Sequence, residues 1–209
     1  MPPLDQFVSQ ILESLDSNSE TIRAQWNSPE GTLTRHFVVD GLLEPELCER
    51  LYLAFPQDGE GFTAQQTFRE KKRASRDFDQ WDPLLVSAIL AFQDASVVEK
   101  VSALLGLSSL EPDPSLYAGG LSMMFPGDYL NPHIDNSHDA DKAKFRRLNL
   151  LFYISPDWQE EFGGNFELWD EERRNPKTIV STANRLVVME TNRTSWHSVS
   201  PVQADRPRC

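Results

Sequence analysis

The residue types best suited to chemistry in this 209-residue sequence are two histidines and one aspartate, in the order His133, Asp135 and His197. His133 and Asp135 lie two positions apart in a strand-like run, which places both side chains on one face of a strand. Two imidazoles and one carboxylate can bind one face of a ferrous ion and leave the other coordination positions open for a co-substrate and oxygen. The triad therefore predicts a metal site of the open, catalytic kind.

The same three side chains allow other interpretations. An H-x-D pair alone is common in ordinary strands, and a lone histidine such as His197 is often a core or surface residue. A zinc hydrolase could use the same ligands, although no glutamate lies beside a histidine as it does in the H-E-x-x-H zinc proteases. A non-catalytic binding module that keeps the fold is a further alternative. Of the other histidines, His36 is expected to be structural and His138 to lie in a solvated loop.

The elements expected before the triad are mainly helical, because apolar residues recur there at helical spacing. The expected helices lie within residues 3–25, about 45–55, 83–93 and 96–105. Residues 36–41 predict a short strand closed by a turn. The polar segment 56–80, with its basic run from Arg69 to Arg76, is interpreted as a solvated connector in preference to a mobile loop over a site.

After residue 114 the pattern changes to short apolar runs separated by turn signals. These runs are residues 116–125, 129–135, 147–154, 164–169, 177–181, 185–190 and 196–202. Short strands at such spacing are typical of a sandwich or barrel. We therefore expect an α+β fold with a mainly β core, in which N-terminal helices buttress a jelly roll.

Charge and cysteine content narrow the function classes. The net charge is −12 and the sequence pI is about 4.7, which argues against broad binding to nucleic acid or to anionic membranes. The two cysteines, Cys48 and Cys209, give no disulfide framework, so a cytoplasmic location is the simplest interpretation. No apolar run approaches membrane-spanning length, and the N-terminus lacks a signal-peptide core.

Several motifs around the triad occur in a familiar order. They are Phe37 to Leu43, Met124 to Leu130, Leu150 to Ile154, Asp157-Trp158, Phe162 to Leu168, Asn184 to Met189 and Trp196 to Val202. In these motifs the sequence resembles the 2-oxoglutarate/Fe(II)-dependent oxygenases, and within them the prolyl-hydroxylase-like branch. The resemblance runs from about Phe37 to the end of the chain, and the motifs together are far more specific than the triad alone.

The resemblance implies a distorted double-stranded β-helix in which His133, Asp135 and His197 hold Fe(II) and 2-oxoglutarate chelates the iron. It leaves ascorbate open as a further cofactor. The implied reaction consumes 2-oxoglutarate and O2 and releases succinate and CO2 while a substrate is hydroxylated. In domain terms we expect an N-terminal helical extension over residues 1–30 and a single oxygenase domain over residues 31–209.

The resemblance favours a protein prolyl residue or similar side chain as the substrate, and a free amino acid or small natural product is the alternative. A groove lined by the 56–80 and 136–146 loops would favour a peptide, whereas a closed pocket would favour a small molecule. Candidate substrate contacts near the iron are Asn131, Asn136 and Tyr117.

The resemblance also implies a basic residue after the distal histidine that binds the far carboxylate of 2-oxoglutarate. Arg208 is the first choice and Arg206 the alternative, because Asp205-Arg206-Pro207 looks like a turn and Arg208 would begin the next strand. Tyr153 matches a tyrosine that contacts the same carboxylate in the hypoxia-sensing prolyl hydroxylases. In the family this last strand continues, so here we expect it to be truncated, with an unpaired sheet edge and a frayed arginine.

Overall fold

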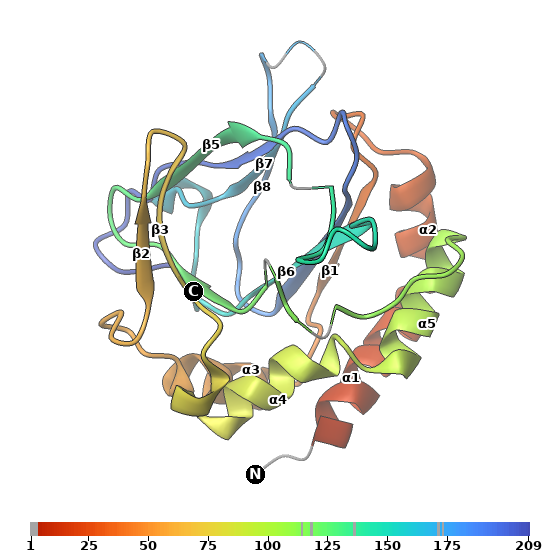
Figure 1. The fold of residues 1–209 in the computed structure, drawn as a ribbon, viewed down its shortest axis with the longest axis horizontal. Coiled ribbons are helices and arrows are strands. Elements are labelled where there is room, and N and C mark those ends of the chain that lie inside the picture. The colour runs from red at the N-terminus through yellow and green to blue at the C-terminus, as the bar shows by residue number, and fades with distance from the viewer. Residues whose placement is uncertain (1–3, 114, 118, 136, 171, 173) are drawn as a thin grey trace.

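The β-strands of the protein surround a central space, and the helices cover one side of it (Figure 1). The computed structural model describes residues 4–113, 115–117, 119–135, 137–170, 172 and 174–209. Two antiparallel sheets form the β core, one with three strands and one with seven. This is the mixed, mainly β jelly roll with N-terminal helices that the sequence predicts.

The helices begin and end at the residues that local sequence favours. Their bounds are α1 Leu4–Ser17, α2 Ser19–Asn27, α3 Pro45–Ala54, α4 Pro83–Ala91 and α5 Ala95–Leu105. Asp82 and Asp94 cap α4 and α5 by accepting hydrogen bonds from backbone N–H groups of the first turns. Gly106 ends α5 in the left-handed conformation, as expected from its position. In place of the single helical stretch expected within residues 3–25, two helices meet at Asn18.

The strands form two sheets whose order is far from the order along the chain. The strands are β1 His36–Asp40, β2 Thr63–Gln66, β3 Glu70–Ser75, β4 Leu121–Met123, β5 Tyr129–His133, β6 Leu148–Tyr153, β7 Phe166–Leu168, β8 Lys177–Ile179, β9 Arg185–Glu190 and β10 His197–Val199. The smaller sheet has the order β1-β9-β6. The larger has the order β2-β3-β5-β10-β7-β8, with β4 also paired to β3. Each of the seven runs predicted after residue 114 contains one of these strands.

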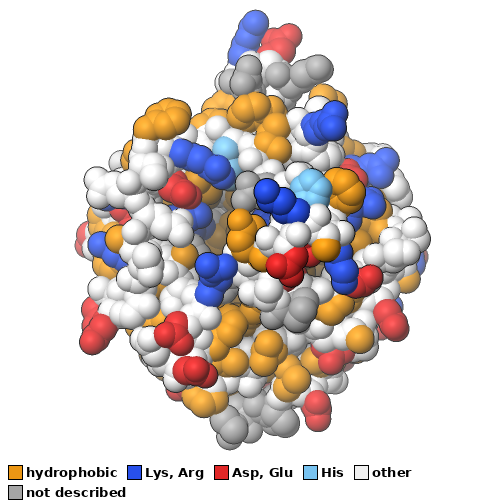
Figure 2. All heavy atoms as spheres, viewed as in Figure 1, with side chains coloured by type: hydrophobic (Ala, Val, Ile, Leu, Met, Phe, Trp, Pro, Cys, Tyr) orange, Lys and Arg blue, Asp and Glu red, His pale blue; other side chains and the backbone are white. Residues whose placement is uncertain are grey.

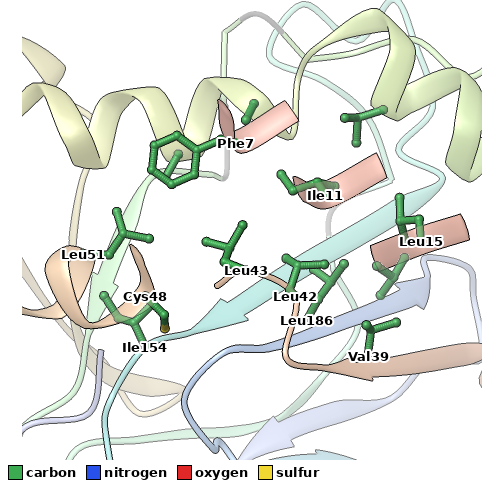
Figure 3. Close-up of a cluster of buried hydrophobic side chains, with 14 of the residues drawn as sticks. Phe7, Ile11, Leu15, Val39, Leu42, Leu43, Cys48, Leu51, Ile154 and Leu186 are labelled. Carbon is green, nitrogen blue, oxygen red and sulfur yellow. The ribbon is translucent and has the colours of Figure 1, made fainter. Parts of the chain in front are cut away.

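Alternate residues of the smaller sheet face two different cores. On β9, Leu186 and Val188 pack with the helices, whereas Val187 and Met189 face the interior between the sheets. In α1, Phe7, Ile11 and Leu15 point from the helix toward the sheet (Figure 3). The helices therefore support the smaller sheet on its outer face, and the functional site lies on its inner face, between the two sheets. The predicted domain boundary at residue 30 stays a prediction.

The interpretation of residues 56–80 as a solvated connector was wrong. Residues 63–75 form the β2–β3 hairpin, and β3 pairs with both β4 and β5. The sequence signal was weak because β2 and β3 carry mainly polar and charged side chains on an edge of the sheet. The hairpin thereby joins the strand that carries His133.

The prediction of a frayed arginine near the C-terminus was also wrong. Arg208 and Met124 exchange backbone hydrogen bonds of 2.8 and 2.9 Å, and the N–H of Ile154 donates to the carbonyl of Cys209. Both Arg208 and Cys209 are buried. These bonds fix the segment between β4 and the end of β6. No helix in the described part of the chain is long and apolar enough to cross a membrane.

Candidate active site

The three predicted ligands converge because two neighbouring strands present them to one point. β10 pairs antiparallel with β5, and His197 lies directly opposite His133 in the register. The two imidazole centroids are 4.2 Å apart. One carboxylate oxygen of Asp135, Oδ1, lies 3.5 Å from His133 Nε2 and 3.6 Å from His197 Nε2. One ligand atom from each residue thus lies within 4.8 Å of the other two, as a metal site requires.

Backbone carbonyls set the tautomer of both histidines. The Nδ1 of His133 lies 2.9 Å from the carbonyl of Asn131, and the Nδ1 of His197 lies 3.0 Å from the carbonyl of Ser195. A carbonyl can only accept, so each Nδ1 carries a proton, and each ring turns its Nε2 toward the common point. Each histidine is oriented by the residue two positions before it.

Asp135 is oriented by its other oxygen, Oδ2. The side chain of Asn149, on β6, donates a hydrogen bond of 3.0 Å to Oδ2, and Arg146 Nη1 lies 3.9 Å from the same atom. These contacts leave Oδ1 facing the imidazoles. The sequence pattern identified neither Asn149 nor Arg146 as a contact of the site. The available signal was a single polar residue inside the apolar β6.

His197 and Asp135 have the protonation states of metal ligands at neutral pH. Burial lowers the pKa of His197 to about 4, against the opposing effect of Asp135. Burial by itself would raise the pKa of Asp135. Hydrogen bonding to His133 and the charges of His197, His133 and Arg146 outweigh burial and lower that pKa to about 2. A neutral His197 imidazole and an ionised Asp135 carboxylate are the forms that bind a cation.

The triad lines a cavity of about 1770 Å³ whose lining also includes Tyr153 and Arg208. Arg208 is 5% exposed and pairs with no carboxylate among the described residues; its guanidinium carbon lies 5.2 Å from the centre of the Tyr153 ring. The Nε of Arg208 and the hydroxyl of Tyr153 are buried without a hydrogen-bond partner among the described residues. Ser181 Oγ lies 3.5 Å from Arg208 Nη1. Buried donors of this kind are costly unless a ligand pairs with them.

Arg206, the alternative to Arg208, lies outside this cavity. Its Nη2 donates to the carbonyls of Pro156 and Asp157 at 2.7 and 3.3 Å. Its guanidinium also lies over the rings of Trp158 and Phe162. The contacts of Arg206 are therefore those of a residue that fixes a turn.

The predicted Gly163-Gly164 turn supports Arg208 from the opposite side. Gly163 has a φ of +62°, and a Cβ there would lie 2.0 Å from the carbonyl oxygen of Pro201. A Cβ on Gly164 would lie 3.2 Å from Cδ of Arg208. Side chains are thus excluded where the turn approaches the C-terminal segment.

The remaining candidate residues have mixed positions. Tyr117 lines the cavity and is partly exposed. The side-chain amide of Asn131 donates a hydrogen bond to the carbonyl of Phe68, so Asn131 supports the β2–β3 hairpin. Asn136 lies outside the described residues. His36 is buried with its Nδ1 near the carbonyl of Thr34, and His138 stacks on Phe145 in the 136–146 loop.

Lys and Arg side chains gather on both sides of the hollow at the centre of the face shown in Figure 2. The cavity lining includes Arg69 and Lys72 of the hairpin and Lys144 and Arg146 of the facing loop. The cavity is thus an open groove between the two loops.

A jelly roll with an open His-Asp-His site and a buried cationic anchor defines a class of metal-dependent enzymes. The chain belongs to the 2OG-Fe(II) oxygenase superfamily, whose family model matches residues 99–209. That stretch contains the whole triad together with Tyr153 and Arg208.

Curated relatives and solved structures agree with this assignment. Prolyl 3-hydroxylase OGFOD1 of Mus musculus is 36% identical over 73 residues, which cover 32% of this chain and 13% of the mouse protein. The chain thus matches only a small part of that relative's length. A prolyl-4-hydroxylase from Pseudomonas putida has a TM-score of 0.62 at 16% identity, over 91% of this chain and 94% of its own.

A prolyl hydroxylase of Trichoplax adhaerens, solved in complex with a peptide fragment of the hypoxia inducible factor oxygen degradation domain, has the same fold. Its TM-score is 0.60 at 18% identity, over 94% of this chain and 88% of its own. These likenesses establish the prolyl-hydroxylase type of jelly roll.

The family's cofactors are Fe(II) and 2-oxoglutarate, and the residues present fit both. Two imidazole nitrogens and one carboxylate oxygen match the preference of a ferrous ion. The unpaired Arg208 Nε and Tyr153 hydroxyl match a carboxylate acceptor.

Proposed function

We propose that this chain is an Fe(II)- and 2-oxoglutarate-dependent dioxygenase that hydroxylates a prolyl residue or similar side chain of a polypeptide, releasing succinate and CO2. One observation carries the proposal: the His-Asp-His triad and a buried arginine without a carboxylate partner line the same cavity. A metal ligand set and a cationic anchor in one cavity match the two ends of 2-oxoglutarate.

His133, Asp135 and His197 would hold the iron, which together with 2-oxoglutarate and O2 supplies the oxidising power that protein side chains lack. The three ligand atoms lie close together in the lining of the cavity. The backbone carbonyls of Asn131 and Ser195 orient both imidazoles, so that each Nε2 faces the position that the metal would take. Asn149 keeps Oδ1 of Asp135 turned toward the metal position.

Arg208 would bind the far carboxylate of 2-oxoglutarate, and Tyr153 would donate its hydroxyl proton to the same group. Burial raises the pKa of Tyr153, against the opposing charge of Arg208, so the hydroxyl remains a donor at neutral pH. In this dry position each hydrogen bond to a charged group is worth about 1.5–3 kcal/mol. Arg206 remains the alternative anchor, and its contacts with Pro156 and Asp157 weigh against it.

The shape of the cavity supports a polypeptide substrate over a small molecule. Its lining includes both the β2–β3 hairpin and the 139–147 segment, which is the groove arrangement expected for a peptide. Two similar proteins support the same choice: the mouse relative is a prolyl 3-hydroxylase, and the Trichoplax adhaerens prolyl hydroxylase was solved in complex with a peptide.

The test is turnover by the metal-reconstituted protein. Purified protein with Fe(II), 2-oxoglutarate and O2 should release succinate, and a H197A variant should not. Proline-containing peptides should gain one oxygen atom by mass spectrometry, whereas free amino acids should not. Bound zinc with no consumption of 2-oxoglutarate would indicate the hydrolase alternative. Intact 2-oxoglutarate binding without turnover would indicate a binding module.

Two further predictions belong to this proposal. We propose the cytoplasm as the location, supported by Cys48 and Cys209, which are both free and buried. We also retain the division into a helical extension over 1–30 and an oxygenase domain over 31–209, although α1 packs on α4 and α5.

A further inference from the structure

Two arginines without partners lie on opposite rims of the cavity. Arg69 is in the turn of the β2–β3 hairpin, and Arg147 comes immediately before β6. Both line the cavity that contains the triad, and both are exposed. Within the described ranges, neither side chain makes an ion pair or a hydrogen bond.

The turn that carries Arg69 is fixed to the strand that carries His133. The backbone N–H of Asn131 donates to the carbonyl of Arg69 at 2.8 Å. The Asn131 side chain donates to the carbonyl of Phe68, also at 2.8 Å. Arg69 is therefore held beside the metal position, although its side chain is unpaired.

Arg147 lies on the opposite side of the cavity, on the same face of the β6 segment as Asn149. Asn149 points into the cavity toward Asp135, and residues two apart share a face. Arg147 thus lies two residues before Asn149 on that face, nearer the mouth of the cavity. Its backbone carbonyl accepts a hydrogen bond from the N–H of Thr191, which fixes this position against the end of β9.

Most other charges around the rim are already paired. The pairs in the cavity lining are Lys72 with Glu70, Lys144 with Glu111, and Arg146 with Asp135. Asp139 accepts backbone hydrogen bonds from its own loop. Asp141 is an exposed carboxylate on the same rim, and its negative charge offsets part of the positive charge of the arginines. Arg76, which also lines the cavity, donates a hydrogen bond to the carbonyl of Tyr117. Among the described residues at the mouth, Arg69 and Arg147 are thus the cations left free for a ligand.

An exposed phenylalanine accompanies the arginines on each rim. Phe68 is 91% exposed beside Arg69, and Phe145 is 71% exposed two residues before Arg147. Aromatic and arginine side chains together are typical of surfaces that bind a polypeptide. Their presence on both sides of the metal position indicates a chain that crosses the mouth.

We propose that the mouth selects an acidic segment of a polypeptide, with carboxylates on both sides of the target residue facing Arg69 and Arg147. This inference rests on the proposed function, because it concerns the substrate of that site. A peptide fits better than a nucleic acid, because the chain as a whole carries a net charge of −12.

The experiment measures binding, so that no turnover is needed. The protein is loaded with Mn(II) and 2-oxoglutarate, and fluorescence anisotropy is recorded with labelled proline-containing peptides flanked by Glu, Ser or Lys. The variants are R69E/R147E and, as a matched control, R50E. Arg50 is exposed on α3 and does not line the cavity. A single-stranded oligonucleotide serves as the competing anion.

We expect the Glu-flanked peptide to bind about tenfold more tightly than the Lys-flanked peptide at low salt, because each exposed ion pair contributes modestly. The preference should weaken as salt is raised. R69E/R147E should invert it, and R50E should keep it. Equal affinity for the three peptides in the wild-type protein overturns the inference, which keeps it testable if the double variant does not fold.

An unchanged preference in a folded R69E/R147E variant, or tighter binding of the oligonucleotide than of the Glu-flanked peptide, also overturns the inference. Succinate release by the Fe(II)-loaded wild-type protein is measured separately. Its absence would refute the proposed function, whereas the charge preference is decided by the binding data.

Discussion

Replacing Arg208 with methionine should separate folding from co-substrate binding. Arg208 is buried and pairs with no carboxylate among the described residues, and its Nε lacks a partner. A buried charge without a partner of opposite charge destabilises the folded state, so an apolar side chain of similar volume should be neutral or stabilising at this position. The R208M variant without 2-oxoglutarate should therefore unfold at the same denaturant concentration as the wild type, or at a higher one.

The same variant should bind 2-oxoglutarate poorly. Removing one partner of a buried ion pair costs about 3–5 kcal/mol. With about 1.4 kcal/mol for each factor of ten, the Kd should rise by roughly 100- to 3000-fold. Calorimetry with Mn(II)-loaded protein measures this directly. R208K should lose less, because lysine keeps the charge but not the paired geometry.

The matched control is R206M, which also separates the two candidate anchors. Arg206 contacts backbone carbonyls and two aromatic rings outside the cavity. R206M should lose stability and retain its Kd for 2-oxoglutarate within about twofold, well under the change that one hydrogen bond to a charged group would give. The reasoning fails if R208M binds 2-oxoglutarate as tightly as the wild type, or if R206M shows the larger loss.

Three further perturbations test the supports of the site. N149A should weaken Mn(II) binding by about 10- to 100-fold in a calorimetric titration, because the carboxylate of Asp135 loses its orienting hydrogen bond. N175A, a control at an exposed position, should bind Mn(II) as the wild type does. Equal Mn(II) affinities of N149A and the wild type would contradict the orienting role of Asn149. G163A should lose more stability in urea than G41A, by about 1–3 kcal/mol, because both positions have positive φ but only Gly163 meets a backbone oxygen. Burial lowers the pKa of His36 below its unfolded value of 6.5, so the folded state binds fewer protons and stability should fall as pH drops below that value. The urea midpoint of the H36Q variant should depend less on pH below 6.5 than that of the wild type. Identical pH slopes for the two proteins would refute this role of His36.

The sequence predicted the elements whose pattern is local. The seven strands after residue 114 and the end of α5 at Gly106 follow from apolar runs and turn residues. The β2–β3 hairpin did not, because a polar edge hairpin has no apolar alternation to reveal it. Its strands are defined by pairing with β4 and β5, which are distant in the sequence.

The metal triad could be predicted as a set because the resemblance fixed three residues at once, whereas its supports could not. Asn149 is one polar side chain in an apolar strand, and only the fold brings it 3.0 Å from Asp135. The burial of Arg208 likewise depends on a backbone pairing with Met124 that no local pattern encodes. The residues that sequence reasoning missed are thus those defined by distant contacts.

The side chains that support the triad depend on the alternation of one further strand, β6. Tyr153 and Asn149 lie four positions apart and face the cavity, and Arg147 extends the same row to the mouth. The intervening residues Leu148, Leu150 and Phe152 pack toward the helices. A slip of one residue in the pairing with β9 would exchange these two sets of side chains. The helical core therefore contributes to function by fixing which face of β6 meets the metal and which meets the helices.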